Sequence, residues 1–229
     1  MSLIRLENIS KIYKTGKVDF PALKEISFSI DKGEFLSIAG PSGSGKTTIL
    51  NIIGCLDKPS DGTLFLNDTD ISSKKSNELA NIRRYNIGFI FQTFNLIPIL
   101  TAFENVEFPL ILKGNMKQKD RELLVEEILT EVGLKDFMYR KPSEMSGGQQ
   151  QRVAIARALI KQPQMILADE PTANLDSKNG KEILQLMLQM NKRTNTTFIF
   201  STHDRMVMDF ALRIITLKDG HIHRDDKRR

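Results

Sequence analysis

The alternation of apolar and polar blocks along the 229-residue chain predicts short strands interspersed with helices. Compact apolar runs that are typical of strands occupy residues 35–40, 62–68, 87–92, 164–170 and 196–204. Residues 212–222 predict a strand, a turn at Asp219–Gly220 and a returning strand. Because several runs are apolar on both faces, we expect a mostly parallel sheet that is covered on both sides.

Helical spacing of apolar residues marks three other segments, at residues 47–56, 120–134 and 180–193. Gly133 is expected to end the second of these helices. From Phe94 to Lys161 the pattern contains no buried strand, so we expect a helical insert within a single α/β domain. The core is assigned to residues 1–92 and 162–229, and the insert to residues 93–161.

Composition adds that the chain is an ordinary globular protein, with 40% hydrophobic and 27% charged residues. No apolar run reaches the ~20 residues that cross a bilayer, and the N-terminus does not look like a signal peptide. The single cysteine, Cys55, excludes an internal disulfide and fits a reducing compartment. We therefore expect a cytosolic protein, in which Cys55 fills the core.

The net charge of +5 does not by itself indicate nucleic-acid binding. The basic residues are scattered, and the one dense cluster, the terminal RDDKRR, also holds two acids. An anionic membrane surface or a polyanionic ligand suits this charge equally well, so no nucleic-acid partner is expected.

The stretch GPSGSGKTT lies between a predicted strand and a predicted helix, which is the context that a phosphate-binding loop requires. Its glycines let the backbone curve closely around an anion and turn N–H groups inward. Lys46 is expected to reach the β and γ phosphates, and the Thr47 hydroxyl to bind Mg²⁺. The residues expected to bind the nucleotide here are Gly40, Pro41, Ser42, Gly43, Ser44, Gly45, Lys46, Thr47 and Thr48.

Two acids follow the buried run MILA, at the sheet edge where ligands of α/β folds bind. Asp169 is expected to hold Mg²⁺, and Glu170 to act as general base toward an attacking water. Without the phosphate loop, two carboxylates that cap the next turn would be an equally good interpretation.

Two further polar residues, Gln92 and His203, close apolar strands. Gln92 could complete the Mg²⁺ shell or orient water, and His203 could donate to the γ-phosphate. Each residue alone is more often a satisfied strand-end polar group, but their shared position at strand ends favours a role in the site. His221 and His223 are interpreted as part of a solvated edge.

The stretch MSGGQ places Ser146, Gly147 and Gly148 at the start of a helix. A hydroxyl, free N–H groups and the helix dipole make a second anion site possible. A plain serine N-cap would be the simpler interpretation if this stretch stood alone.

Together these motifs strongly resemble those of ABC transporter ATPase subunits, over almost the whole chain. GPSGSGKTT resembles their phosphate loop, Gln92 the Q-loop glutamine, and MSGGQ, including Gln149, their signature motif. ANLD at residues 173–176 is similar to the D-loop, and His203 to the switch histidine. Tyr13 is placed like the aromatic residue that stacks on adenine. One departure is Met145, where the family usually has leucine, a change of similar volume.

The resemblance implies an α/β P-loop core with an antiparallel β part and an inserted helical subdomain, together with ATP and Mg²⁺ as ligands. It implies a head-to-tail dimer in which Ser146 and Gly148 of one chain close on the ATP of the other. It also implies an integral-membrane permease as partner and a peripheral position on the cytoplasmic face of the membrane. The subfamily of lipoprotein release, macrolide export and antimicrobial-peptide resistance, with the related cell-division ATPase, is most similar in three stretches: GCLDKPSDG, IGFIFQTFNLIPILTAFENVEFPL and MSGGQQQRVAIARAL.

Three questions stay open at this level. The apolar stretch with Ile97 and Leu100 could dock a helix of the membrane partner or pack the insert's own core. A mechanical regulator without transport, as in the related cell-division ATPase, is an alternative function. A soluble ABC-type ATPase that acts on nucleic acid is another, although such proteins usually carry tandem units or long inserts.

Overall fold

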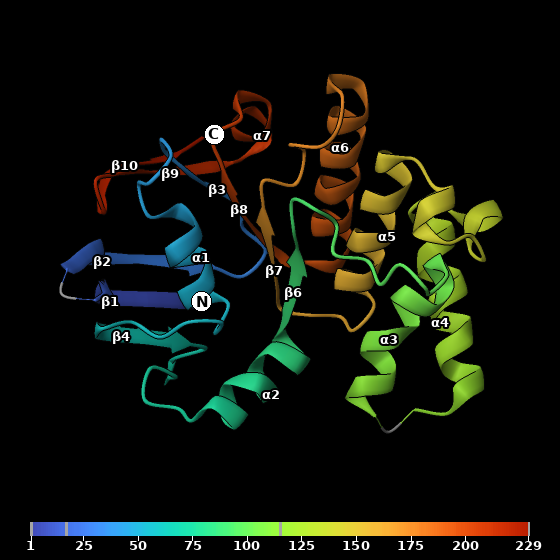
Figure 1. The fold of residues 1–229 in the computed structure, drawn as a ribbon, viewed down its shortest axis with the longest axis horizontal. Helices are drawn as coiled ribbons and strands as arrows, with labels where there is room; N and C mark the ends of the chain where they lie inside the picture. The colour runs from blue at the N-terminus through green and yellow to red at the C-terminus, as the bar shows by residue number, and fades with distance from the viewer. Residues whose placement is uncertain (1, 17, 115, 229) are drawn as a thin grey trace. The chain divides into compact units, whose positions relative to one another are not determined.

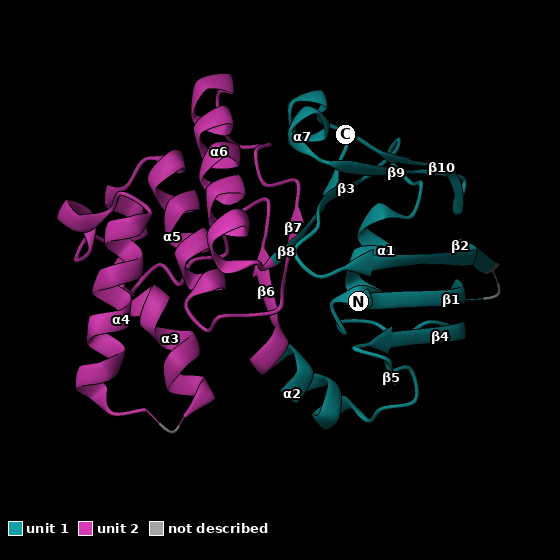
Figure 2. Ribbon diagram, turned by 180° about the vertical axis from the view of Figure 1, so that it is seen from behind, with its two compact units in different colours: residues 1–83, 197–229 teal, residues 84–196 magenta. Residues whose placement is uncertain are grey.

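The computed structural model describes residues 2–16, 18–114 and 116–228, and Figure 1 labels its elements in chain order. By internal packing the chain divides into two compact units, coloured in Figure 2. Unit 1 comprises residues 1–83 and 197–229, and unit 2 comprises residues 84–196. The boundaries that the sequence suggests, at residues 92 and 162, stay a prediction.

Unit 1 contains an antiparallel sheet in the order β2-β1-β4-β5. Its strands are β1 (Ser2–Thr15), β2 (Val18–Asp31), β4 (Asp61–Leu66) and β5 (Thr69–Asp70). The sequence pattern indicated β4 but neither of the two long strands before it. The reason lies in the register of β1, which shifts three times between Leu6 and Ile12 and so breaks the period of two.

The second group of strands in unit 1 runs in the order β10-β9-β3-β8. It consists of β3 (Phe35–Ala39), β8 (Thr197–Thr202), β9 (Arg213–Lys218) and β10 (His221–Lys227). β3 pairs in parallel with β8 and β9, and only β10 is antiparallel. Asp219 and Gly220 have φ angles of 50° and 81°, which gives the predicted turn.

The core of this group is aromatic, with the rings of Phe35 and Phe200 4.7 Å apart between centroids. Helix α1 (Lys46–Ile53) packs on β8 and β2, and α7 (Arg205–Phe210) packs on β3 and β8. Both helices thus pack on β8, the strand that precedes His203.

Unit 2 contains one parallel pair of strands, β6 (Ile87–Ile90) and β7 (Met165–Asp169). Its helices are α3 (Ala102–Lys113), α4 (Gln118–Glu131), α5 (Gly147–Leu159) and α6 (Ser177–Thr194), with short 3-10 turns at η1 (Lys135–Phe137) and η2 (Pro142–Glu144). α2 (Ser76–Asn86) crosses the boundary between the units. Helix α5 packs against β6, α3, α4 and α6, so it is the central helix of the unit.

Within residues 93–161, the described residues form helices and loops and no strand, as the sequence predicts. Gly133 follows the C-cap residue of α4, Val132, and has a φ angle of 77°, in the left-handed conformation that ends a helix. None of the helices in the described ranges is long and apolar enough to span a membrane.

Cys55 lies at the end of α1 and is 4% exposed, in agreement with a role in core packing. Burial raises the pKa of its thiol to about 11. His221 and His223 are exposed on β10, as a solvated edge requires.

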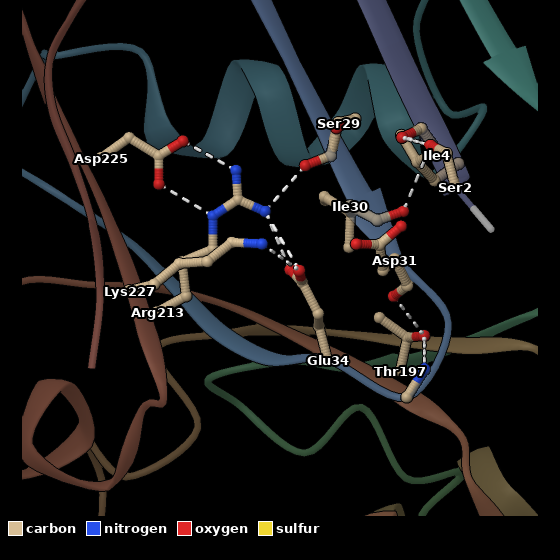
Figure 3. A network of polar contacts seen from close by, with 11 residues as sticks. Ser2, Ile4, Ser29, Ile30, Asp31, Glu34, Thr197, Arg213, Asp225 and Lys227 are labelled. Carbon is tan, nitrogen blue, oxygen red and sulfur yellow. Dashed lines mark hydrogen bonds and ion pairs between the residues drawn. The ribbon is translucent and has the colours of Figure 1, made fainter. Parts of the chain in front are cut away.

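The C-terminal strand β10 is held to the rest of unit 1 by Arg213, which is 9% exposed at its side chain (Figure 3). Its guanidinium donates to both oxygens of Asp225, at 2.8 and 2.7 Å, and to Glu34 at 2.9 Å. A further bond of 2.7 Å reaches the Ser29 carbonyl. The bonds to Asp225 and then to Glu34 raise the pKa of Arg213, although burial lowers it, so the side chain stays charged.

Replacing Arg213 by Met is expected to lower the free energy of unfolding by about 2–3 kcal/mol, because Asp225 loses the cation that binds both of its oxygens and Glu34 keeps only Lys227, at 3.6 Å. Arg224→Ala is the matched control, since its ion pair with Asp226 is exposed at 71% and 45% and should contribute below ~0.5 kcal/mol. Urea denaturation monitored by circular dichroism compares the two. Equal losses in both variants would contradict a structural role of the Arg213 cluster.

Candidate nucleotide-binding site

The predicted phosphate loop joins the buried strand β3 to the start of α1. Gly45 is the N-cap of α1 and has a φ angle of 102°, which residues with a side chain rarely adopt. A Cβ atom there would lie 2.7 Å from Leu23 Cδ2 and 2.8 Å from the Ala22 carbonyl oxygen. Both the backbone conformation and the lack of space therefore require glycine at this position.

Lys46 is the first residue of α1 and is only 8% exposed. Its Nζ donates to the carbonyl oxygens of Gly40 and Pro41, at 2.8 and 2.9 Å, which fixes the ammonium group against the loop. Ser44 Oγ is buried and has no hydrogen-bond partner among the described residues. A buried cation and an unsatisfied hydroxyl beside a helix N-terminus fit a polyphosphate ligand.

Tyr13 lies on β1 and is 37% exposed. Its hydroxyl donates to Asp57 at 2.9 Å, and Asp57 also accepts from Lys11 at 2.6 Å. Burial raises the pKa of Tyr13, a side-chain hydrogen bond with Thr48 of the phosphate loop lowers it, and Asp57 raises it further, so that the net pKa is raised. The ammonium of Lys11 is 4.9 Å from the Tyr13 ring centroid. The structure thus places the predicted adenine-stacking residue beside the loop.

His203 follows β8 and is exposed, one residue before Asp204 caps α7 by accepting from Met206 N–H at 2.8 Å. In the parallel register, Thr202 of β8 is the partner of Ala39 of β3. Gly40 and His203 thus emerge at the same edge of the strands in unit 1, as the sequence predicts.

The same holds in unit 2, where Ile90 of β6 and Ala168 of β7 are register partners. Gln92 follows the first strand and is exposed, and Asp169 ends the second. Glu170 has a φ angle of 45°, a left-handed conformation that is costly for a residue with a side chain and is characteristic of functional sites.

The signature stretch caps α5 with a reciprocal pair of hydrogen bonds. Ser146 Oγ accepts from Gln149 N–H at 3.3 Å, and Gln149 Oε1 accepts from Ser146 N–H at 2.9 Å. The N–H groups of Gly147 and Gly148 belong to the first turn and have no acceptor within the helix. The simpler interpretation, a serine N-cap, is therefore present, and it leaves two donors available to an anion.

Three of the predicted motifs converge within unit 2. A Cβ atom on Gly147 would lie 3.6 Å from the Asn174 carbonyl oxygen and 3.8 Å from Phe94 Cζ. Asn174 Nδ2 donates to the Gln92 carbonyl at 2.8 Å. The signature helix, the segment after Gln92 and the segment ANLD thus contact one another.

Sequence reasoning missed two residues of α5 that contact the predicted catalytic segments. Gln151 is fully buried and its Nε2 donates at 2.7 Å to the carbonyl of Pro171, which follows Glu170. Arg157 donates to the carbonyls of Phe94 and Asn95. For Gln151, the one signal in the sequence was its position on the buried face of a helix. Arg157 gave no signal, because an arginine on a helix usually indicates only a solvated surface.

The described residues contain no cluster of three or more histidine, cysteine or acidic side chains that could enclose a metal ion. The predicted Mg²⁺ ligands Thr47, Gln92 and Asp169 offer hard oxygen donors, which fit Mg²⁺ when phosphate oxygens and water complete its shell. Thr47 and Asp169 belong to different units, so each is described in its own surroundings.

A glycine loop with a fixed lysine, between a buried parallel strand and a helix, defines a P-loop nucleotide-binding protein. The family model of the ABC transporter matches residues 23–173. The ABC transporter ATP-binding protein MJ0796 of Methanocaldococcus jannaschii is 51% identical, with 99% of this chain and 98% of that protein covered. The chain therefore belongs to the ABC transporter family, and it is an ABC-type ATPase that binds ATP.

A solved structure and a further relative agree with this assignment. A dimeric, post-hydrolysis structure of the MJ0796 cassette bound to ADP and Pi superposes with a TM-score of 0.90 at 50% identity, over 99% of both chains. The macrolide export ATP-binding/permease protein MacB of Syntrophobacter fumaroxidans is 44% identical over 97% of this chain, which covers 31% of that protein. The predicted fold, a P-loop core with parallel and antiparallel β parts and a helical region, is confirmed.

Gly45→Ala is expected to destabilise the protein by at least ~2 kcal/mol, because its Cβ meets Leu23 and the Ala22 carbonyl. Gly43→Ala is the control: its φ angle is 78°, but a Cβ there meets nothing within 4 Å. It should therefore cost only the ~1–2 kcal/mol of a left-handed alanine. Thermal denaturation of both variants gives the comparison, and a Gly45 variant as stable as the Gly43 variant would refute the close contact.

Proposed function

We propose that this ATPase powers a membrane transporter as one of two copies that close around ATP and Mg²⁺. The observation that carries the proposal is the presence in one chain of two separate anion-facing helix starts, at Lys46 and at Ser146. A single nucleotide needs one phosphate loop, so the second site serves a different nucleotide. A second copy of the chain supplies that nucleotide, and the dimeric form of the MJ0796 cassette supports this arrangement.

In the proposed dimer, each nucleotide is shared between two chains. Residues 40–48 of one chain hold the phosphates, and Tyr13 stacks on the adenine. Ser146, Gly147, Gly148 and Gln149 of the other chain approach the γ-phosphate with the N–H groups of the first turn of α5. Ser146 is exposed, and its hydroxyl accepts from Gln149 N–H at 3.3 Å. In the proposed dimer the hydroxyl gives up this bond and donates to the phosphate instead.

Hydrolysis is assigned to three residues. Glu170 accepts a proton from the water whose oxygen attacks the γ-phosphorus, while the bond to the β–γ bridging oxygen breaks and ADP leaves. Gln92 orients the water, and His203 donates to the γ-phosphate. Thr47, Gln92 and Asp169 would hold Mg²⁺, which would supply positive charge to the phosphate oxygens when bound.

The membrane partner is proposed to be a permease that docks on the loop before α3. Asn105 is 1% exposed and braces this loop: its Oδ1 accepts from Ile97 N–H at 2.8 Å, and its Nδ2 donates to the carbonyls of Ile97 and Leu100, each at 3.1 Å. The brace presents Ile99, which is 76% exposed, while Ile97 and Leu100 are half-buried. The sequence left open whether this stretch docks a partner or packs the core of the insert. In our proposal, Ile99 serves docking, and Ile97 and Leu100 contribute to the core.

The transported substrate belongs, in our proposal, to the class exported by the macrolide-type systems, since MacB proteins are 44% identical to this chain. The alternatives within the same subfamily are lipoproteins and antimicrobial peptides. A permease partner places the protein at the cytoplasmic face of the membrane.

Glu170→Gln is expected to lower the ATPase rate by about 100-fold or more, because glutamine cannot accept the proton. ATP binding should persist, and the ATP-bound variant should elute as a dimer in size-exclusion chromatography. Phosphate release and elution volume are measured together. Wild-type turnover in this variant would remove Glu170 from the role of general base, and a purely monomeric variant would refute the shared nucleotide.

Ile99→Glu is expected to abolish co-purification with the permease partner when the two are expressed together, because a charge replaces the exposed apolar contact. Leu123→Glu, at a residue of α4 that is 57% exposed, is the matched control and should leave the complex intact. ATPase activity of the isolated chain should be unchanged in both. Retention of the complex by Ile99→Glu would exclude this docking surface.

A further inference from the structure

Arg157 connects the signature helix to the segment that carries Gln92. It lies in the last turn of α5, and its guanidinium donates to the carbonyl oxygen of Asn95 at 2.5 Å and to that of Phe94 at 2.7 Å. These carbonyls belong to the second and third residues after Gln92. Arg157 thus holds the backbone directly beside the predicted Mg²⁺ and water ligand.

The segment it holds has an unusual backbone. Phe94 and Asn95 have φ angles of 60° and 49°, so two consecutive residues with side chains adopt the left-handed conformation. Asparagine tolerates this conformation, but phenylalanine does not favour it. The turn also directs two successive carbonyl oxygens toward one cation. The guanidinium therefore helps to stabilise a backbone conformation that is costly for Phe94.

Arg157 has no carboxylate partner among the described residues; its bonds there go to the two carbonyls. Burial lowers the pKa of Arg157. A guanidinium nevertheless keeps its charge in proteins. A half-buried cation bound only by carbonyl dipoles is well suited to fixing backbone geometry. Because Arg157 forms no ion pair with the described residues, it is not simply a charge that keeps the surface soluble.

The other side of Gln92 is held as well, since its own carbonyl accepts from Asn174 at 2.8 Å. Gln92 thus lies between two backbone attachments, one to α5 and one to the segment ANLD. Arg157 and Ser146 stand on the same helix, 11 residues or about 16 Å apart along its axis. Because α5 is continuous from Gly147 to Leu159, a displacement at its start reaches Arg157 directly.

We propose that Arg157 is a positioning residue that couples the signature end of α5 to the placement of Gln92. The coupling rests on the proposed function, because it gives the approach of a partner's nucleotide a route to the site within the same chain. Arg157 does not touch the nucleotide; it sets the backbone from which Gln92 acts.

The test compares four proteins by steady-state ATPase kinetics and by binding of a fluorescent ATP analogue. These are the wild type, Arg157→Ala, Arg157→Lys and the matched control Arg152→Ala. Arg152 lies on the same helix and also donates to a backbone carbonyl, that of Val132 at 3.0 Å, and pairs with Glu182 at 3.3 Å. Among the described residues, its hydrogen bonds and its ion pair reach none of the predicted catalytic segments.

Arg157→Ala is expected to lower kcat by about 10-fold or more with little change in KM or in analogue binding, because Gln92 is misplaced. Arg157→Lys should recover part of kcat, since an ammonium can donate to the carbonyls but lacks the planar fork. Arg152→Ala should keep wild-type kcat. Equal losses in the Arg152 and Arg157 variants would assign Arg157 a general structural role and overturn the proposal.

A double-mutant cycle with Gln92→Ala provides the decisive measurement. If Arg157 acts through Gln92, adding Arg157→Ala to Gln92→Ala should lower kcat by less than about 2-fold more. If the loss of kcat in the double variant equals the product of the two single losses, the coupling is refuted. Where Arg157→Ala is less stable, Arg157→Lys replaces it in the same cycle. If wild type and Arg152→Ala both lack ATPase activity, the proposed function fails instead, which is a distinct outcome.

Discussion

Close contact between backbone segments at the phosphate loop is the constraint on which the nucleotide site depends. An added Cβ atom at Gly40 would lie 2.3 Å from the Leu217 carbonyl oxygen, and one at Gly45 would lie 2.8 Å from that of Ala22. Leu217 belongs to β9 and Ala22 to β2, so strands of both groups in unit 1 press against the loop. A loop that is fixed in this way offers donors that are already oriented, which lowers the entropy cost of binding a phosphate.

In unit 2 the corresponding support is α5, whose buried face does more than fill the core. Gln151 holds the carbonyl after Glu170, and Arg157 holds the carbonyls that follow Gln92. The helix that begins at Ser146 therefore stabilises the backbone next to two proposed catalytic residues. Since α5 packs against β6, α3, α4 and α6, the rest of the unit keeps this helix in place.

Much of this could be predicted from the sequence, because a glycine loop between a strand and a helix and polar residues at strand ends leave strong local patterns. β1 and β2 escaped prediction because bulges in β1 interrupt its alternation. The contact of Arg157 could not be predicted because its partners are backbone carbonyl oxygens. Every residue has such an oxygen, so the sequence gives no signal for the contact. The roles of Glu170, His203 and Gln92 stay predictions, since they concern a reaction and not a conformation.

The environment of Cys55 has a practical consequence for studying conformational cycles. It is the one cysteine of the chain, 4% exposed, and its thiol has a pKa raised to about 11. At neutral pH the thiol is therefore almost entirely protonated, whereas alkylating reagents and disulfides react with the thiolate. Spectroscopic probes or cross-linkers can therefore be attached to cysteines introduced elsewhere while the native one is retained. The wild-type background already serves as an almost silent template for distance measurements.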